Sequence, residues 1–183
     1  SLYGMYGVFI YICIFAVEVC GQVVEQVDAG RKLQIYEELA TKDMLTKLYN
    51  RNAYDEWIKV NRRPEKAKIV IFDLNNLKQC NDTMGHAAGD AYIQNAAGII
   101  LHVFGNCGNC YRIGGDEFCV VIQGNVPSDM EELFRQMRQE QDEFNAKNAI
   151  PQIQIAYGYA EFDPETDRDI EDTRSRADDK MYQ

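Results

Sequence analysis

The chain has 183 residues, of which 46% are hydrophobic and 26% are charged, a balance typical of a globular domain and not of a disordered segment. Its formal net charge of −10 argues against binding to a nucleic-acid polymer, which requires a basic face. A single nucleotide that arrives with a divalent cation is compatible with this charge.

Residues 1–17 carry no charged side chain and would form a helix about 25 Å long, slightly short of a ~30 Å hydrocarbon core. We interpret them as the end of a membrane-spanning helix that begins outside this sequence, and Arg31 and Lys32 then favour a cytoplasmic continuation. A buried or dimerising helix is the alternative. Residues 18–40 predict a stalk or signalling helix, paired with a copy of itself or solvated alone. Its seam, with the 3-4-3 spacing of a coiled coil, consists of Val17, Cys20, Val24 and Val27.

Residues 42–61 predict two short helices, with a break and a new cap at Asn50. The β-branched and aromatic run 67–72 predicts a buried central strand that ends at Asp73. A turn into a short helix follows and is broken over residues 81–86. Gly89 and Asp90 then open a long amphipathic helix that reaches Phe104.

Two apolar runs flank Gly114-Gly115-Asp116-Glu117, which predicts a hairpin because glycine takes a positive φ without a Cβ clash. A helix capped at 127–129, a strand over 151–159 and a helix over 169–182 complete the chain. The order βαββαβα predicts an α/β (α+β) fold with a central mixed, mostly antiparallel sheet flanked by helices and preceded by the N-terminal helix.

The six cysteines lack the spacing of a disulfide framework and indicate reduced thiols. Cys107 and Cys110 form a lone CxxC pair, with His102 five residues earlier. This pattern indicates a loop, and a zinc or redox role is the alternative.

Two acidic strand ends form the candidate site, Asp73 and the hairpin tip Asp116-Glu117. If their strands are neighbours, the carboxylates repel unless a divalent metal lies between them. Such an arrangement holds Mg²⁺ against a triphosphate in nucleotidyl transfer. Lys78, one turn after the strand, is placed to contact a phosphate. An acidic turn without a ligand is the alternative.

Asn81 and Asp90 flank the loop between the two helices that follow the central strand. A carboxylate accepts hydrogen bonds from the N1–H and exocyclic amine of guanine, and an amide pairs with O6 or N3. The two residues therefore form a candidate guanine site. Each also has a structural alternative, since Asn81 can end its helix and Asp90 can cap the next one.

Four ordered blocks of this sequence resemble the GGDEF domains, the diguanylate cyclase family. They are DMLTKLYNR at 43–51, DLNNLKQCNDTMGHAAGD at 73–90, RIGGDEF at 112–118 and ADDKMY at 177–182. The resemblance implies a GGDEF domain over residues 41–183 with a nucleotide-cyclase or palm-like fold, whose C-terminal strand lies beyond Gln183.

The resemblance also implies the reaction. Two domains of a homodimer each hold one GTP with Mg²⁺ or Mn²⁺ and together form cyclic di-GMP and two pyrophosphates. Asp73 and Asp116 would bind the metal together with the Leu74 carbonyl. Glu117 would assist metal binding or activate the attacking hydroxyl.

For the substrate, the resemblance implies that Gly114 and Gly115 let the phosphates approach closely. Lys78 would lie beside the phosphates, and Asn81 and Asp90 would read guanine.

Some positions depart from the family pattern. Asn75 replaces the second aspartate of the D-x-D motif, so weaker metal binding is expected, and Lys47 and Leu77 replace a glycine and a phenylalanine at structural positions. The R-x-x-D of the family's inhibitory product site is replaced by Gly105-Asn-Cys-Gly108, which predicts no feedback inhibition there.

Two functions follow. The first is an active diguanylate cyclase on the inner face of the cell membrane, controlled by an N-terminal membrane or sensory module. The alternative is a catalytically silent GGDEF module that binds GTP or a protein partner.

Overall fold

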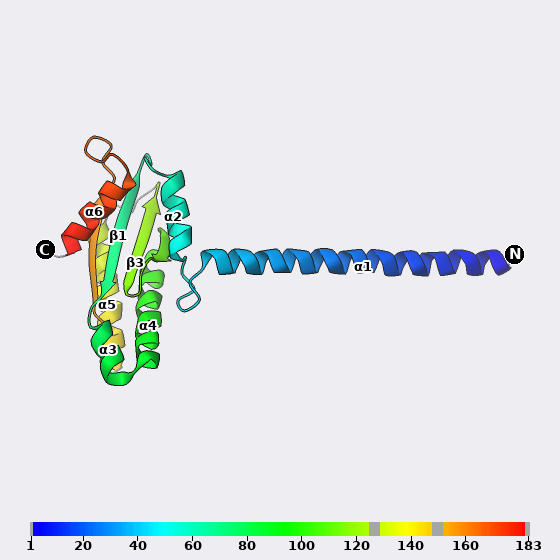
Figure 1. Cartoon of the computed structure of the whole chain (residues 1–183), viewed down its shortest axis with the longest axis horizontal. Helices are drawn as coiled ribbons and strands as arrows, with labels where there is room; N and C mark the ends of the chain where they lie inside the picture. The colour runs from blue at the N-terminus through cyan, green and yellow to red at the C-terminus, as the bar shows by residue number, and fades with distance from the viewer. Residues whose placement is uncertain (1, 125–128, 148–151, 182–183) are drawn as a thin grey trace. The chain divides into compact units, whose positions relative to one another are not determined.

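A computed structural model describes residues 2–124, 129–147 and 152–181. The chain divides into two units, residues 1–40 and 41–183. The described residues of the first unit all lie in one helix, α1 (Leu2–Thr41), so the expected membrane segment and stalk are one uninterrupted helix (Figure 1). Where the structure describes the chain, none of its helices combines the length and the apolar character that a bilayer crossing requires.

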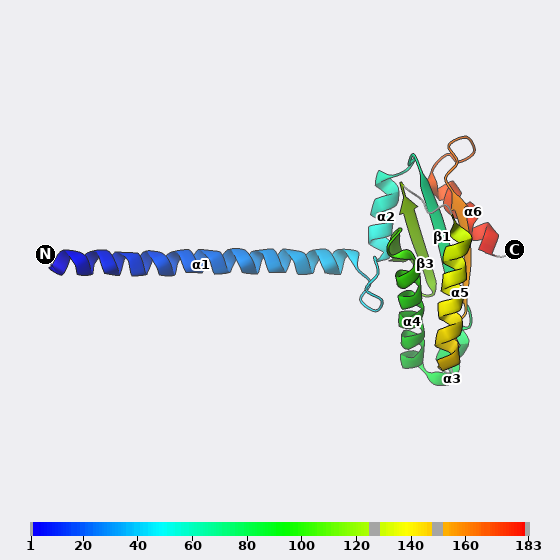
Figure 2. The ribbon, with the colours of Figure 1, turned by 180° about the vertical axis from the view of Figure 1, so that it is seen from behind.

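The second unit is built on a four-stranded sheet in the order β2-β3-β1-β4 (Figures 1 and 2). Its strands are β1 (Ala67–Leu74), β2 (Asn109–Arg112), β3 (Glu117–Gln123) and β4 (Ile155–Glu161). The three strand pairs are all antiparallel, which confirms the predicted sheet. Among the described residues, parallel pairing is limited to an isolated bridge between Tyr49 and Tyr111.

Helices cover both faces of the sheet. They are α2 (Arg51–Val60), α3 (Leu77–Met84), α4 (His86–Phe104), α5 (Met130–Lys147) and α6 (Ile170–Met181). Side chains of β1 alternate between the two faces, as a pleated strand requires. Val70 and Phe72 pack in the cluster with α3, α4 and α5, and Ile69 and Ile71 pack in the cluster with α2 and α6.

The prediction of two short helices over 42–61 is wrong for the first of them. Residues 42–50 instead form a turn, in which the Asp43 N–H donates to the Leu48 carbonyl at 2.8 Å and Lys47 has φ 63°. The predicted cap is confirmed, because the Asn50 side chain accepts a hydrogen bond from the Ala53 N–H at 3.0 Å. A residue in the left-handed region cannot continue a right-handed helix, so the apolar spacing here serves packing, with Leu48 buried.

The boundary between α3 and α4 also differs from the expectation. Helix α3 continues to Met84, and the chain turns at the single residue Gly85, whose φ is +85°. Helix α4 therefore starts at His86, and β4 starts at Ile155 instead of Pro151. The expected cap at 127–128 lies outside the described residues, but Asp129 accepts from the Glu132 N–H at 3.1 Å as a helix cap does.

Candidate active site

Asp73 of β1 is the direct cross-strand partner of Glu117 of β3. The side-chain alternation of both strands places the two carboxylates on the face covered by α2 and α6, because Ile71 and Cys119, two residues away on each strand, pack there. Like charges directly opposite each other in a sheet are destabilising. The expected meeting of the central strand and the hairpin tip is therefore present, and it concentrates negative charge.

The hairpin tip is hydrogen-bonded to the end of β1. The Leu74 N–H donates to the Asp116 carbonyl at 3.1 Å, and the Ile113 and Gly114 N–H groups both donate to the Glu117 carbonyl, at 3.0 and 3.2 Å. Asp116 is half-buried and Glu117 is exposed. These bonds bring Asp73, the Leu74 backbone and Asp116 to one end of the sheet.

The positive φ predicted for the pair Gly114-Gly115 is wrong. The glycines with positive φ in the described residues are Gly85 and Gly124, so Gly114 and Gly115 form the tip without it. A Cβ at Gly114 would lie 2.7 Å from Glu117 Oε2, whereas a Cβ at Gly115 would meet nothing within 4 Å. Gly114 thus leaves space for a carboxylate, and Gly115 leaves open space at the tip.

Burial raises the pKa of Asp73, and the negative charges of Asp116, Glu117 and Asp178 raise it further. Sequence reasoning did not place Asp178 at the site, although it belongs to the block ADDKMY, because the helix that carries it is remote in sequence. No group of three His, Cys, Asp or Glu side chains in the described ranges is arranged to hold a metal ion. Two carboxylates and the Leu74 carbonyl could hold one together with ligands from a phosphate, which suits a hard divalent cation.

The candidate guanine residues are brought together by helices α3 and α4. Gly89 is buried, and a Cβ there would lie 1.9 Å from Asn81 Oδ1, so the Asn81 amide lies directly against the residue before Asp90. Asn81 does help to end its helix, because its carbonyl accepts from the Gly85 N–H at 2.9 Å. The capping role considered for Asp90 is wrong, since α4 begins at His86 and Asp90 is an exposed residue within it.

Lys78 and Asn75 lie on either side of the turn that leads into α3, and both are exposed. The backbone at Asn75 is fixed on both sides, since its N–H donates to the Gln154 carbonyl at 3.0 Å and its carbonyl accepts from the Tyr92 hydroxyl at 2.8 Å. Replacement of the family's aspartate by Asn75 therefore changes charge without leaving this backbone unpaired.

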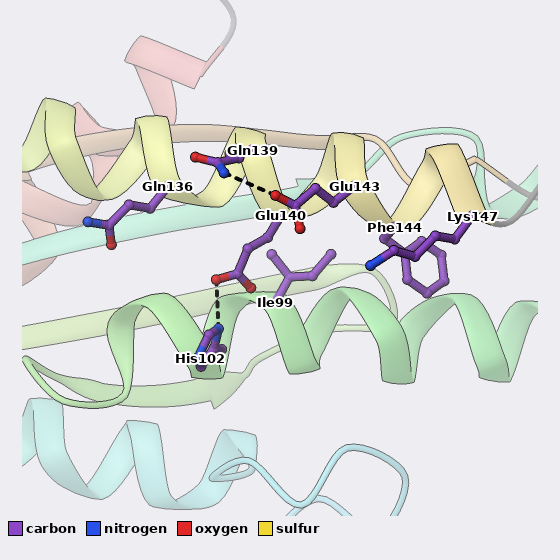
Figure 3. Close-up of a pocket in the computed structure, with 8 residues that line it drawn as sticks. All are labelled: Ile99, His102, Gln136, Gln139, Glu140, Glu143, Phe144 and Lys147. Carbon is purple, nitrogen blue, oxygen red and sulfur yellow. Dashed lines mark hydrogen bonds and ion pairs between the residues drawn. The ribbon is translucent and has the colours of Figure 1, made fainter.

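Among the described residues, a groove of about 550 Å³ lies between α4 and α5 (Figure 3). In this groove, His102 Nδ1 lies 2.6 Å from Glu140 Oε1, within hydrogen-bond distance. None of the predicted site residues lines the groove, so we assign the candidate site from the carboxylates and not from the cavity.

The comparisons with known proteins agree with this geometry. The model of the family described as "Diguanylate cyclase, GGDEF domain" matches residues 40–183. The chain belongs to the GGDEF domain family.

Two curated relatives have names that include the words diguanylate cyclase. Diguanylate cyclase DgcS of Shewanella oneidensis is 34% identical over 99 residues, which cover 50% of this chain and 33% of that protein. Probable diguanylate cyclase DgcE of Escherichia coli is 33% identical over 106 residues, which cover 55% of this chain and 10% of that protein. The chain thus spans a third or less of the length of these relatives.

Among solved structures, the coiled coil and GGDEF domain of DgcB from Caulobacter crescentus, in complex with c-di-GMP, matches with a TM-score of 0.72. The match covers 92% of each chain at 21% identity. At this identity the match establishes the fold.

Proposed function

We propose that the chain is a diguanylate cyclase that condenses two GTP into cyclic di-GMP and two pyrophosphates. The observation that carries the proposal is the opposed pair Asp73 and Glu117, with Asp116 at the adjacent tip. Like charges placed opposite each other destabilise the fold. A divalent cation between the carboxylates and a triphosphate would remove this repulsion, so the same carboxylates would bind the cation and its nucleotide.

In the proposed site, Asp73, Asp116 and the Leu74 carbonyl would hold Mg²⁺ or Mn²⁺. Bound there, the ion supplies positive charge that neutralises the triphosphate and the leaving pyrophosphate. Asn81 and Asp90 orient guanine, and Lys78 contacts a phosphate. Gly114 and Gly115 leave room for the phosphate oxygens.

The reaction forms two ester bonds and breaks two anhydride bonds. The 3′-hydroxyl oxygen of each GTP bonds to the α-phosphorus of the other, and the bond from that phosphorus to the pyrophosphate oxygen breaks. Glu117 accepts the hydroxyl proton or assists in holding the cation. Because each chain holds one GTP, the reaction requires two chains with their sites facing each other.

Pairing through the stalk would supply this homodimer. The seam residues Cys20, Val24 and Val27 are exposed on α1. Exposed apolar side chains at coiled-coil spacing gain free energy when a second copy buries them. We propose that residues 18–40 form this stalk and transmit a signal to a cytoplasmic domain over 41–183. Membrane attachment through residues 1–17 stays a prediction, which flotation of the chain with lipid vesicles tests.

We also propose that the domain lacks feedback inhibition at the family's R-x-x-D position. A Cβ at Gly105 would lie 2.4 Å from the Leu101 carbonyl oxygen, and one at Gly108 would lie 2.6 Å from the Val121 carbonyl oxygen. Because backbone occupies both spaces, side chains at these positions require the backbone to move. Micromolar binding of cyclic di-GMP that is lost on mutation of residues 105–108 would contradict this.

The second candidate is a catalytically silent module that binds GTP or a protein partner, and Asn75 is the observation that favours it. One fewer carboxylate at this turn lowers the negative charge available to a cation.

The decisive experiment incubates the chain with GTP and Mg²⁺ and measures pyrophosphate release and cyclic di-GMP. Asp116→Ala is the test variant, and Glu131→Ala, at an exposed position on α5, is the matched control. We expect product from the wild type and the control and none from Asp116→Ala. A dimeric wild type that binds GTP but releases no pyrophosphate would support the silent module.

A further inference from the structure

The segment that follows α1 is attached to the edge of the sheet. We call residues 42–51 the junction segment. The Tyr49 N–H donates to the Cys110 carbonyl at 3.0 Å, and the Arg112 N–H donates to the Tyr49 carbonyl at 2.8 Å. The Tyr49 and Tyr111 rings also pack with centroids 5.4 Å apart. The junction segment therefore lies along β2, the strand that leads into the Gly114-Gly115 tip.

An ion pair extends from the junction segment to the tip. Arg112 donates through one terminal nitrogen to both oxygens of Asp43, at 3.2 and 3.3 Å, and through the other to the Gly115 carbonyl at 2.8 Å. The Arg112 and Asp43 side chains are only 14% and 23% exposed, so solvent screens this pair less than a surface pair.

Asp43 is held in place by its own turn. The Thr46 N–H and hydroxyl donate to Asp43 Oδ1 at 2.8 and 2.7 Å. Burial alone raises the pKa of Asp43, but these hydrogen bonds and the charge of Arg112 lower it below the ordinary value. Asp43 is therefore a fixed anion at neutral pH.

A second arginine holds the other side of the glycine pair. Arg51, the last residue of the junction segment, donates to the Ile113 carbonyl at 3.1 Å. The carbonyls of Ile113 and Gly115, one before and one after Gly114, are thus each held by a guanidinium. Gly114 and Gly115 have no side chain that could fix the position of the tip by packing or hydrogen bonding. The hydrogen bonds from Arg51 and Arg112 to the neighbouring carbonyls restrain it instead.

The two contacts also orient the tip's N–H groups. A trans peptide is planar with its N–H opposite its C=O, so holding the Gly115 carbonyl fixes the direction of the Asp116 N–H. Among the described residues, no acceptor is hydrogen-bonded to the N–H of Gly115 or Asp116. The Asp116 N–H therefore points to the side of its peptide away from the Gly115 carbonyl and Arg112, where it is available to an anion.

We infer that Asp43, Arg51 and Arg112 are positioning residues, which hold the tip so that Asp116 and the adjacent N–H groups are preorganised for the metal and the triphosphate. The inference rests on the proposed function. It also gives the stalk a physical route to the site, because the junction segment begins one residue after α1 ends at Thr41. A change imposed on that helix end reaches Asp43 within two residues.

The test compares the wild type with Arg51→Gln and Asp43→Asn. Arg51 is 54% exposed, so its replacement removes the carbonyl contact without leaving a buried charge unpaired. The matched control is Glu56→Gln, which breaks an ion pair with Lys59 whose side chains are 68–69% exposed, on the same helix as Arg51 and away from the tip. Circular dichroism establishes that each variant is folded.

For both variants we expect a fall in kcat of about 10- to 100-fold, since small misplacements of reacting groups cost this much. The Mg²⁺ concentration for half-maximal rate rises about fivefold, while GTP binding without Mg²⁺, measured by titration calorimetry, is unchanged. Glu56→Gln behaves as the wild type. Equal kcat and Mg²⁺ dependence in the folded variants, or loss of activity only in proportion to loss of folded protein, would overturn the inference.

A readout without nucleotide separates the inference from the proposed function. Amide hydrogen exchange of a peptide over 112–118 is measured on the chain alone. We expect faster exchange in Arg51→Gln than in the wild type or Glu56→Gln. If the wild type is inactive but Arg51→Gln still exchanges faster, the cyclase proposal is wrong and the positioning role stands. If exchange is the same in all three proteins, the positioning role is wrong.

Discussion

The backbone of Gly158 in β4 lies against the carbonyl of Ala177 in α6, so closely that an added Cβ would stand 2.1 Å from that oxygen. The same Cβ would stand 2.7 Å from the Met181 nitrogen. This contact sets how near α6 comes to the sheet, and with it the place of Asp178 beside Asp73.

We therefore expect Gly158→Ala to lower the free energy of unfolding by about 3 kcal/mol, because helix backbone cannot yield as a side chain can. Denaturant unfolding measures the change. Gly98→Ala is the matched control: Gly98 is exposed in α4 with nothing within 4 Å of its Cβ position. There alanine should stabilise by about 0.5–1 kcal/mol through helix propensity. Equal effects at the two positions would refute the close-contact explanation.

Asp73 predicts a pH dependence of the metal-free chain. Its pKa is raised in the folded state, so between the ordinary and the raised value the folded chain binds more protons than the unfolded chain. Stability from this group therefore falls as pH rises through that window and stays lower above it. At neutral pH, Asp73→Asn should raise Tm by about 2–4 °C. Mg²⁺ with GTP should then raise the Tm of the wild type and not that of the variant.

The control for Asp73→Asn is a measurement at pH 3, where the wild-type carboxylate is protonated and the two chains should have closely similar Tm values. A variant that is less stable than the wild type at neutral pH would show that the negative charge at Asp73 is not a cost.

Lys47 occupies the left-handed region with φ 63° in the junction segment. A residue with a Cβ costs about 1–2 kcal/mol in this region, and glycine removes that cost. Glycine also gives the unfolded chain more conformational entropy, which offsets part of the gain in stability. We expect Lys47→Gly to stabilise the chain by about 1 kcal/mol in thermal or denaturant unfolding. Lys47→Ala keeps the Cβ and serves as control, with little change expected. Stabilisation by alanine as large as that by glycine would assign the effect to the lysine charge.

Gly89 predicts a variant that binds nucleotide poorly yet folds. Its Cβ position lies 1.9 Å from Asn81 Oδ1 and 2.8 Å from Asn81 Cγ, so alanine would displace a side chain and not backbone. We expect Gly89→Ala to weaken GTP binding about tenfold in titration calorimetry while its Tm changes little, because one guanine contact is misplaced. Gly98→Ala on the same helix should bind as the wild type. If Gly89→Ala binds GTP with unchanged affinity, Asn81 does not contribute to guanine recognition.

Several features could be predicted from local pattern alone. The run 67–72 contains β-branched and aromatic residues that suit a strand buried on both faces, and β1 covers it. The Asn50 cap and the sequence positions of the four strands agree with the predictions, since each depends on neighbours in sequence. Boundaries set by a single backbone angle were not predictable, as Lys47 and Gly85 show.

The sequence by itself determined the family, because four ordered blocks carry the residue types that the chemistry needs, and it named Asp73, Asp116 and Glu117 before any fold was known. Only the tertiary structure decided that Asp73 faces Glu117, that Asp178 adds its charge, and that Asp43 holds the tip through Arg112. Strand register and contacts across 69 residues of chain depend on how whole elements pack, and no local pattern encodes that distance.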